Sequence, residues 1–148
     1  MNVFKNILIA LDLSDIDDTL IQYANYLAEN FDVDNIYFVH NIKKYEISDF
    51  LEQEIKDIDL EESISQELND KVSEIMSNTV KWEVLISDDP YTESLINYIT
   101  NKYHITTVML GNKNGNKGTG LVGFKLLRLL KCNVLWIPKI KAIDIEKV

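Results

Sequence analysis

Cysteine and histidine are scarce in this sequence, and both shortages exclude classes of site. Cys132 is the single cysteine, so the chain can form neither an internal disulfide nor a four-cysteine zinc site. The two histidines, His40 and His104, lie far apart in the sequence, which argues against a histidine-rich metal site. We therefore expect no bound metal ion.

Long apolar runs are also missing. No run approaches the ~20 residues that a membrane-spanning helix needs. Residues 1–6 lack the basic, apolar and small-residue zones of a signal peptide. We therefore expect a cytoplasmic protein without a membrane partner. The formal charge of −9 argues against general nucleic-acid binding, which needs clustered Lys and Arg to neutralise phosphates.

Carboxylates are absent from one third of the chain. Residues 94–143 contain eight basic residues and no acid, whereas residues 1–93 contain 22 acids and six basic residues. A region free of carboxylates would attract an anion. The alternative is that the acids simply collect on solvent-exposed helices in the first half, and charge alone does not decide between the two.

Apolar runs and amphipathic stretches alternate along all 148 residues, which suits one domain with a core over about residues 3–138 and a tail at 139–148. Strands are expected at 7–11, 35–42, 80–86, 105–110 and 134–137. Helices are expected from an N-cap at Ser14 to Phe31, over 60–77, after Asp89-Pro90, and around 126–130. The order predicts a three-layer α/β domain around a mostly parallel sheet.

Glycine is rare but concentrated. All five glycines fall within thirteen residues, between an expected strand and an expected helix: Gly111, Gly115, Gly118, Gly120 and Gly123. Backbone amides in such a loop can bind a phosphate at the N-terminus of the helix, and Lys113 and Lys117 lie within it. The loop fits neither common phosphate-binding glycine pattern, and the alternative is a connector without a ligand.

Five short segments match, in order and with the right gaps, the pattern of one known family. Segment 4–14 (FKNILIALDLS) resembles the first strand of the universal stress proteins, small α/β proteins of which many bind adenine nucleotides. Segment 37–41 (YFVHN) resembles their second strand, and segment 87–95, which begins SDDP, resembles their Gly-Asp-Pro helix entry. Segments 108–111 (VMLG) and 132–138 (CNVLWIP) resemble the fourth strand with its loop glycine and the closing strand.

This resemblance implies a flavodoxin-like or Rossmann-like five-stranded sheet in the order 3-2-1-4-5. Asp12 and Gly111 would then face one crevice at the carboxyl ends of neighbouring strands. It further implies an adenine-nucleotide site, with ATP or AMP as the cofactor, formed by Ala10, Asp12, Asn41, Gly111, Gly115, Gly118, Thr119 and Gly120. It also implies a homodimer joined through the fifth strand, 133–138.

The glycine loop departs from the family pattern G-x2-G-x9-G-[ST]. Asn114 stands where the second glycine is expected, and the last motif glycine, Gly120, lies only nine residues after Gly111 and precedes Leu121. The loop is therefore about four residues shorter than the ATP-binding form. This argues against ATP and leaves AMP, another small anion or no ligand as alternatives.

Three functions remain as hypotheses. The first is a nucleotide-binding stress-response protein, and the second is a nucleotide-free member of the same fold that acts as an interaction module. The third, a haloacid-dehalogenase-like phosphatase, is suggested by the D-x-D-x-T match at Asp15 and Asp17, but the apolar strand stops too early, at Asp12. We expect no dedicated enzyme and at most slow ATP hydrolysis. His40 and Cys132 are interpreted as packed core groups, and Trp136 as either core or interface.

Overall fold

A five-stranded sheet forms the centre of the computed structural model, which describes residues 2–42, 57–77, 80–112 and 129–138. All neighbouring strands pair in parallel, in the order β3-β2-β1-β4-β5. The strands are β1 (Asn6–Leu11), β2 (Asn35–Asn41), β3 (Lys81–Ser87), β4 (Thr107–Asn112) and β5 (Asn133–Pro138). The predicted fold class and strand order are confirmed.

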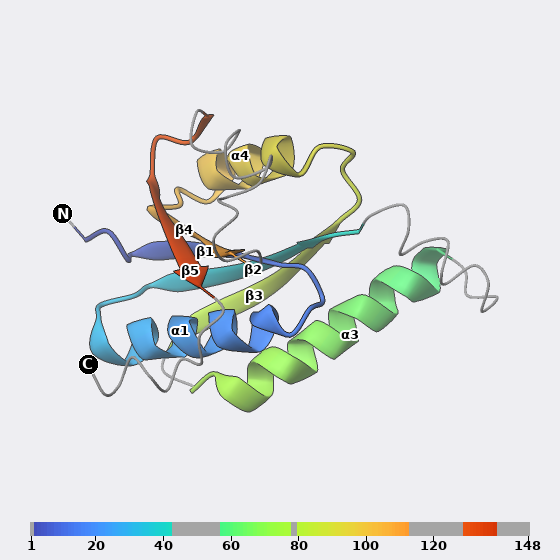
Figure 1. Cartoon of the computed structure of the whole chain (residues 1–148), viewed down its shortest axis with the longest axis horizontal. Coiled ribbons are helices and arrows are strands. Elements are labelled where there is room, and N and C mark those ends of the chain that lie inside the picture. The colour runs from blue at the N-terminus through green and yellow to red at the C-terminus, as the bar shows by residue number, and fades with distance from the viewer. Residues whose placement is uncertain (1, 43–56, 78–79, 113–128, 139–148) are drawn as a thin grey trace.

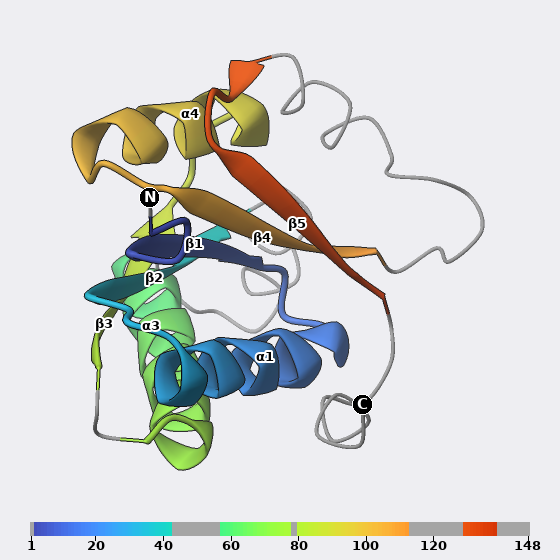
Figure 2. The ribbon, with the colours of Figure 1, turned by 90° about the vertical axis from the view of Figure 1, so that its left-hand side faces the viewer.

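Helices cover both faces of the sheet (Figures 1 and 2). Helices α1 (Ile16–Asn30) and α3 (Asp57–Ile75) lie on one face, and α4 (Thr92–Lys102) lies on the other. Successive residues of a strand point to opposite faces, and a strand that is covered on both faces is apolar throughout. Strand β1 shows this pattern, since Ile7 and Ile9 pack in the core with α1 and α3 while Leu8 packs in the core with α4.

The apolar residues of the helices pack in the two hydrophobic cores, one on each face of the sheet. In α1 and α3 the apolar residues at spacings of three and four are buried, including Leu20, Ile64 and Leu68. In α4 the same spacing buries Leu95 and Ile99 against the other face of the sheet. The apolar faces of the helices are therefore buried against the sheet, as the alternation along the sequence predicts.

Several element boundaries differ from the sequence predictions. Helix α1 takes Asp15, not Ser14, as its N-cap residue, and it ends at Asn30. Phe31 is in extended backbone and 48% exposed, so it does not continue the buried face of the helix. Helix α4 begins at Thr92, two residues after the expected proline start at Pro90.

Other sequence predictions fall partly or wholly outside the described residues. The helix expected around 126–130 lies mainly in the segment 113–128, and the tail 139–148 is also outside. Of the five glycines, only Gly111 is described. Within the described ranges, no helix has both the length and the apolar composition that crossing a membrane requires.

Candidate functional site

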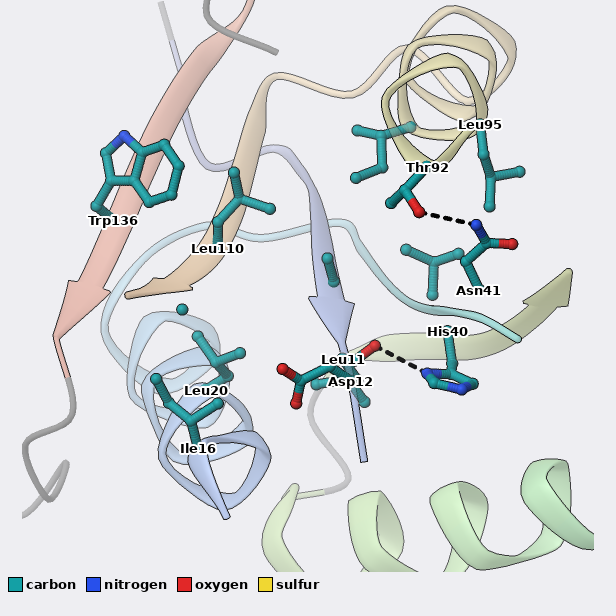
Figure 3. A pocket seen from close by; sticks show the side chains of 14 residues that line it. Leu11, Asp12, Ile16, Leu20, His40, Asn41, Thr92, Leu95, Leu110 and Trp136 are labelled. Atoms are coloured by element: carbon teal, nitrogen blue, oxygen red, sulfur yellow. Dashed lines mark hydrogen bonds between the residues drawn. The ribbon is translucent and has the colours of Figure 1, made fainter. Parts of the chain in front are cut away.

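A pocket opens at the carboxyl ends of the strands, between the start of α1 and the start of α4 (Figure 3). Strands β1 and β4 are neighbours there, although the chain leaves β1 toward β2 and leaves β4 toward β5. This reversal is the switch point at which open parallel sheets bind ligands. The pocket has a volume of about 190 Å³, below the about 300–1,000 Å³ of sites for drug-sized ligands. It therefore suits a small ligand or one ring of a larger ligand.

The wall of the pocket is mainly apolar and is built from every layer of the fold. Its apolar side chains include Leu20, Val39, Leu95, Ile96, Leu110 and Trp136. In Figure 3 Leu20 comes from α1, Leu95 from α4, Leu110 from β4 and Trp136 from β5. An apolar wall with a few polar groups is typical of a small-molecule site.

Asp12 brings a carboxylate to the pocket directly after β1. Its Oδ1 accepts hydrogen bonds from the backbone N–H of Ser14 at 3.0 Å and from the Ser14 hydroxyl. The serine therefore supports Asp12 rather than capping helix α1. Such a carboxylate can accept hydrogen bonds from the hydroxyl groups of a sugar.

Asp17 is fully buried on the first turn of α1, where its carboxylate contacts the backbone of Asp12. Its two oxygens accept hydrogen bonds from the backbone N–H groups of Asp12, at 3.0 Å, and Leu13, at 2.8 Å. Burial, together with the nearby charge of Asp12, raises the pKa of Asp17 from 3.8 to about 6. Ionised at neutral pH, this carboxylate fixes the backbone of the β1–α1 turn.

The end of β2 is tied to both neighbouring elements. His40 is 1% exposed, and its Nδ1 donates to the carbonyl oxygen of Leu11 at 3.0 Å, which confirms it as a buried, hydrogen-bonded group. Asn41 Nδ2 donates to the carbonyl oxygen of Asp89 and to Oγ1 of Thr92, each at 2.8 Å. Asn41 thus anchors the start of α4, and its buried Oδ1 has no hydrogen-bond partner among the described residues.

Gly111 allows β4 to approach helix α1 closely. A Cβ at this position would lie 2.8 Å from Cδ1 of Ile16, much closer than normal carbon contacts. Ile16 is itself 2% exposed and packs in the core. A larger residue at this position would have to displace the side chain of Ile16, so the packing between the end of β4 and the first residue of α1 favours glycine here.

Four of the eight residues predicted as nucleotide ligands line this pocket: Ala10, Asp12, Asn41 and Gly111. They come from three different strands and are far apart in the sequence, and the structure brings them together. The other four, Gly115, Gly118, Thr119 and Gly120, lie outside the described residues. That any of the eight binds a nucleotide stays a prediction.

The sequence analysis did not assign Thr92, Leu95 or Trp136 to the site. Thr92 lies at the start of α4, where its hydroxyl holds the amide of Asn41. Trp136 is partly buried, packs with the core on the α4 face and also lines the pocket. The position of Thr92 two residues after Pro90, in the expected helix entry, was the one sequence signal that could have placed it at this edge of the sheet.

The remaining candidate groups are Asp15, Asp17 and Cys132. In the phosphatase motif the first aspartate directly follows an apolar strand. Asp15 and Asp17 instead lie several residues after the end of β1, and the carboxylate of Asp17 accepts hydrogen bonds from two backbone amides. The described residues hold no cluster of three potential metal ligands. Cys132 packs with the core on the α4 face, and burial raises the pKa of its thiol. The raised pKa favours an unreactive thiol, as expected from the sequence.

Comparisons with known proteins connect this fold to solved structures. No protein-family model matches the chain, and no curated protein matches it. A universal stress protein family structure from Burkholderia pseudomallei has 19% sequence identity and a TM-score of 0.66, covering 92% of this chain and 97% of that one. A universal stress protein in complex with cAMP has 13% identity and a TM-score of 0.62, covering 93% of this chain and 98% of that one.

A third similar structure is a universal stress protein family protein from Arabidopsis thaliana with AMP bound. It has 15% identity and a TM-score of 0.58, and the match covers 92% of each chain. These matches span nearly the full length of both partners, and the strand order is the one that the sequence resemblance implies. At such low identities they establish the architecture rather than the ligand. The chain has the α/β fold of the universal stress proteins.

Proposed function

We propose that the pocket between β1 and β4 binds an adenine nucleoside monophosphate, and that the protein is a ligand-binding module rather than a dedicated enzyme. The observation that carries the proposal is the convergence of Asp12, Asn41 and Gly111 on one apolar-walled pocket at the switch point of the sheet. Proteins of the same fold with AMP and with cAMP bound support this ligand class.

The chemistry of the pocket suits a nucleoside. The apolar side chains of Val39, Leu95 and Ile96 offer a surface for a purine base, and the carboxylate of Asp12 offers acceptors for ribose hydroxyls. A volume of about 190 Å³ accommodates one ring of such a ligand, and the preference for a monophosphate over ATP rests on the short glycine loop. The phosphate-binding prediction rests on loop residues outside the described part, so it stays a prediction from the sequence.

Calorimetric titration of the purified protein with AMP, ATP and adenosine tests this proposal. AMP should bind more tightly than ATP. Replacing Asp12 with asparagine keeps the acceptor for Ser14 but removes the charge, and should weaken AMP binding by about 10-fold or more, the usual effect of losing a hydrogen bond to a charged group. Asp18→Asn is the matched control, because Asp18 is an exposed residue on the first turn of α1 that pairs with Lys71.

Two outcomes would contradict the proposal. AMP binding that is unchanged in Asp12→Asn would place the ligand elsewhere. No binding of any of the three compounds would favour the nucleotide-free interaction module. In that case the oligomeric state and a protein partner would become the functional question.

We also propose that two copies associate through β5. This strand is at the edge of the sheet, with β4 on one side and no described strand on the other. An edge strand presents unpaired backbone groups that a second chain can cover. Light scattering coupled to gel filtration should give twice the mass of the 148-residue chain, and hydrogen exchange should show protected amides in β5. A monomer at every concentration would refute this part.

A further inference from the structure

The turn between β1 and α1 adopts a conformation that needs support. Leu13 has a φ of 65°, in the left-handed region that residues with a Cβ rarely adopt. Its backbone N–H and that of Asp12 both donate to the carboxylate of Asp17, at 2.8 and 3.0 Å. The side chain of Asp17 thus holds the two residues that connect the strand to the helix.

The same turn carries the candidate ligand-binding carboxylate. Asp12 lines the pocket, and the backbone N–H and hydroxyl of Ser14 donate to its Oδ1. Figure 3 shows Asp12 at the end of β1 beside Ile16 on α1. Any change in the backbone at Leu13 would therefore move the carboxylate of Asp12 relative to the pocket.

We propose that Asp17 is a positioning residue of this site, whose buried carboxylate holds the β1–α1 turn and so keeps Asp12 oriented for the ligand. The inference rests on the proposed function, because it assigns to Asp17 the support of a residue that we propose contacts the nucleoside. Asp17 itself has 0% exposure, so it acts through Asp12 and not by touching the ligand.

The carboxylate of Asp17 titrates near pH 6, so its support of the turn depends on pH. In the described part of the chain, the charged groups that act on it are Asp12 in the turn and Lys71 on α3. Lys71 is shared with Asp18, to which its Nζ lies at 3.5 Å. Burial is the largest effect and raises the pKa of Asp17 to about 6, so the carboxylate takes up a proton on mild acidification.

Protonation reduces the number of hydrogen bonds that the carboxylate of Asp17 can accept. An ionised carboxylate accepts with both oxygens, whereas a protonated one turns one oxygen into an O–H donor. One of the two backbone N–H groups then loses an acceptor, and the left-handed conformation at Leu13 loses part of its support. Ligand affinity should therefore fall as the pH falls through about 6.

Adenosine is the appropriate probe for this effect. The phosphate of AMP has a second pKa near 6, so the charge of that ligand would change over the same range. For the wild-type protein we expect adenosine affinity to fall by about 10-fold between pH 7.5 and pH 5, which corresponds to one lost hydrogen bond. For Asp17→Asn we expect the weaker affinity already at pH 7.5, with no step near pH 6.

Asp18→Asn is the matched control and should keep the wild-type affinity at pH 7.5 and the step in the pH profile. The midpoint of that step should move slightly to lower pH, because Lys71 no longer shares its charge with Asp18. The inference is overturned if Asp17→Asn binds adenosine as tightly as the wild type, if it keeps the pH step, or if wild-type affinity rises on acidification. A rise would mean that the charge of Asp17 repels the ligand instead of supporting the site. The wild-type pH profile tests the inference even if Asp17→Asn does not fold.

Amide NMR shifts of the ligand-free protein separate this inference from the proposed function. The N–H signals of Asp12 and Leu13 should titrate together with a midpoint near 6 in the wild type and should not titrate in Asp17→Asn. If adenosine does not bind at any pH, the proposed function fails, and with it the positioning role. If adenosine binds but these amides do not titrate, the positioning role fails and the proposed function stands.

Discussion

Replacing Gly111 with alanine tests how closely the end of β4 approaches helix α1. The new Cβ would lie 2.8 Å from Cδ1 of Ile16 and 3.3 Å from its Cγ1 and Cγ2. Carbon atoms normally pack at about 3.5–4.0 Å, so Cδ1 has to move by roughly 1 Å. Ile16 is only 2% exposed and packs in the core, although its side chain also borders the pocket and can move partly toward it. The alanine should therefore overpack this contact.

The expected magnitude follows from two opposing contributions. Overpacking a core costs about 1–3 kcal/mol, whereas removing a glycine from a strand returns about 0.5–1 kcal/mol by reducing the entropy of the unfolded chain. The free energy of unfolding of Gly111→Ala should thus be about 0–2.5 kcal/mol lower than that of the wild type, with about 1 kcal/mol as the central expectation. Urea unfolding followed by circular dichroism measures this difference.

A double-mutant cycle with Ile16→Val identifies the cause. That substitution removes Cδ1 and should cost about 0.5–1.5 kcal/mol alone. Ile16→Val also removes the closest contact of the new alanine. The loss of unfolding free energy in the double variant should therefore be smaller than the sum of the two single losses by about 0.5 kcal/mol or more. Additive losses, or a Gly111→Ala variant more stable than the wild type, would refute the packing argument.

Three further predictions address individual groups. Because folding raises the pKa of Asp17 from 3.8 to about 6, the folded state binds the proton more tightly than the unfolded state. The free energy of unfolding of the wild type, relative to that of Asp17→Asn, should therefore fall by up to about 3 kcal/mol as the pH rises from 4 to 7. Urea unfolding at each pH measures this difference, and a difference that does not change with pH would contradict the prediction. Because burial raises the pKa of Cys132, its thiol should react with iodoacetamide at pH 7 more slowly than free cysteine, and an equal or faster rate would be inconsistent with the packed position. Phe38→Ala should lower the free energy of unfolding by about 3–5 kcal/mol, because Phe38 is 0% exposed and packs edge-on against Trp82. Thermal unfolding measures this loss, and a loss under about 1 kcal/mol would argue against the described core packing.

The fold was predictable because its signals are local and repeated. The near-continuous apolar run of β1 and the three-and-four spacing of α1 and α3 reflect burial on defined faces, and these patterns survive without tertiary information. Phe31 shows the limit: it continues the spacing of α1, yet the backbone becomes extended there and the ring remains half exposed. Spacing does not indicate where a helix stops when no strong stop signal is present.

The site was predictable only in part, because a pocket depends on contacts between distant segments. Asp12 and Gly111 follow strands, and the strand order alone brings them together. The sequence predicted an N-cap at Ser14 and did not predict a contact between Asp17 and Asp12, whereas the carboxylate of Asp17 folds back onto the amides of Asp12 and Leu13. The spacing of residues along the chain does not reveal in which direction such a side chain points.

The most direct test of the proposed nucleotide site is a pair of amide NMR spectra, recorded without and with saturating AMP. We predict shift changes concentrated at Ala10, Asp12, Asn41, Gly111 and the indole N–H of Trp136, which all line one pocket. Residues at the opposite end of the sheet, such as Asn101 and His104, line a separate pocket and should not shift. Unchanged spectra, or changes centred on Asn101 and His104, would contradict the nucleotide site proposed at the β1–β4 switch point.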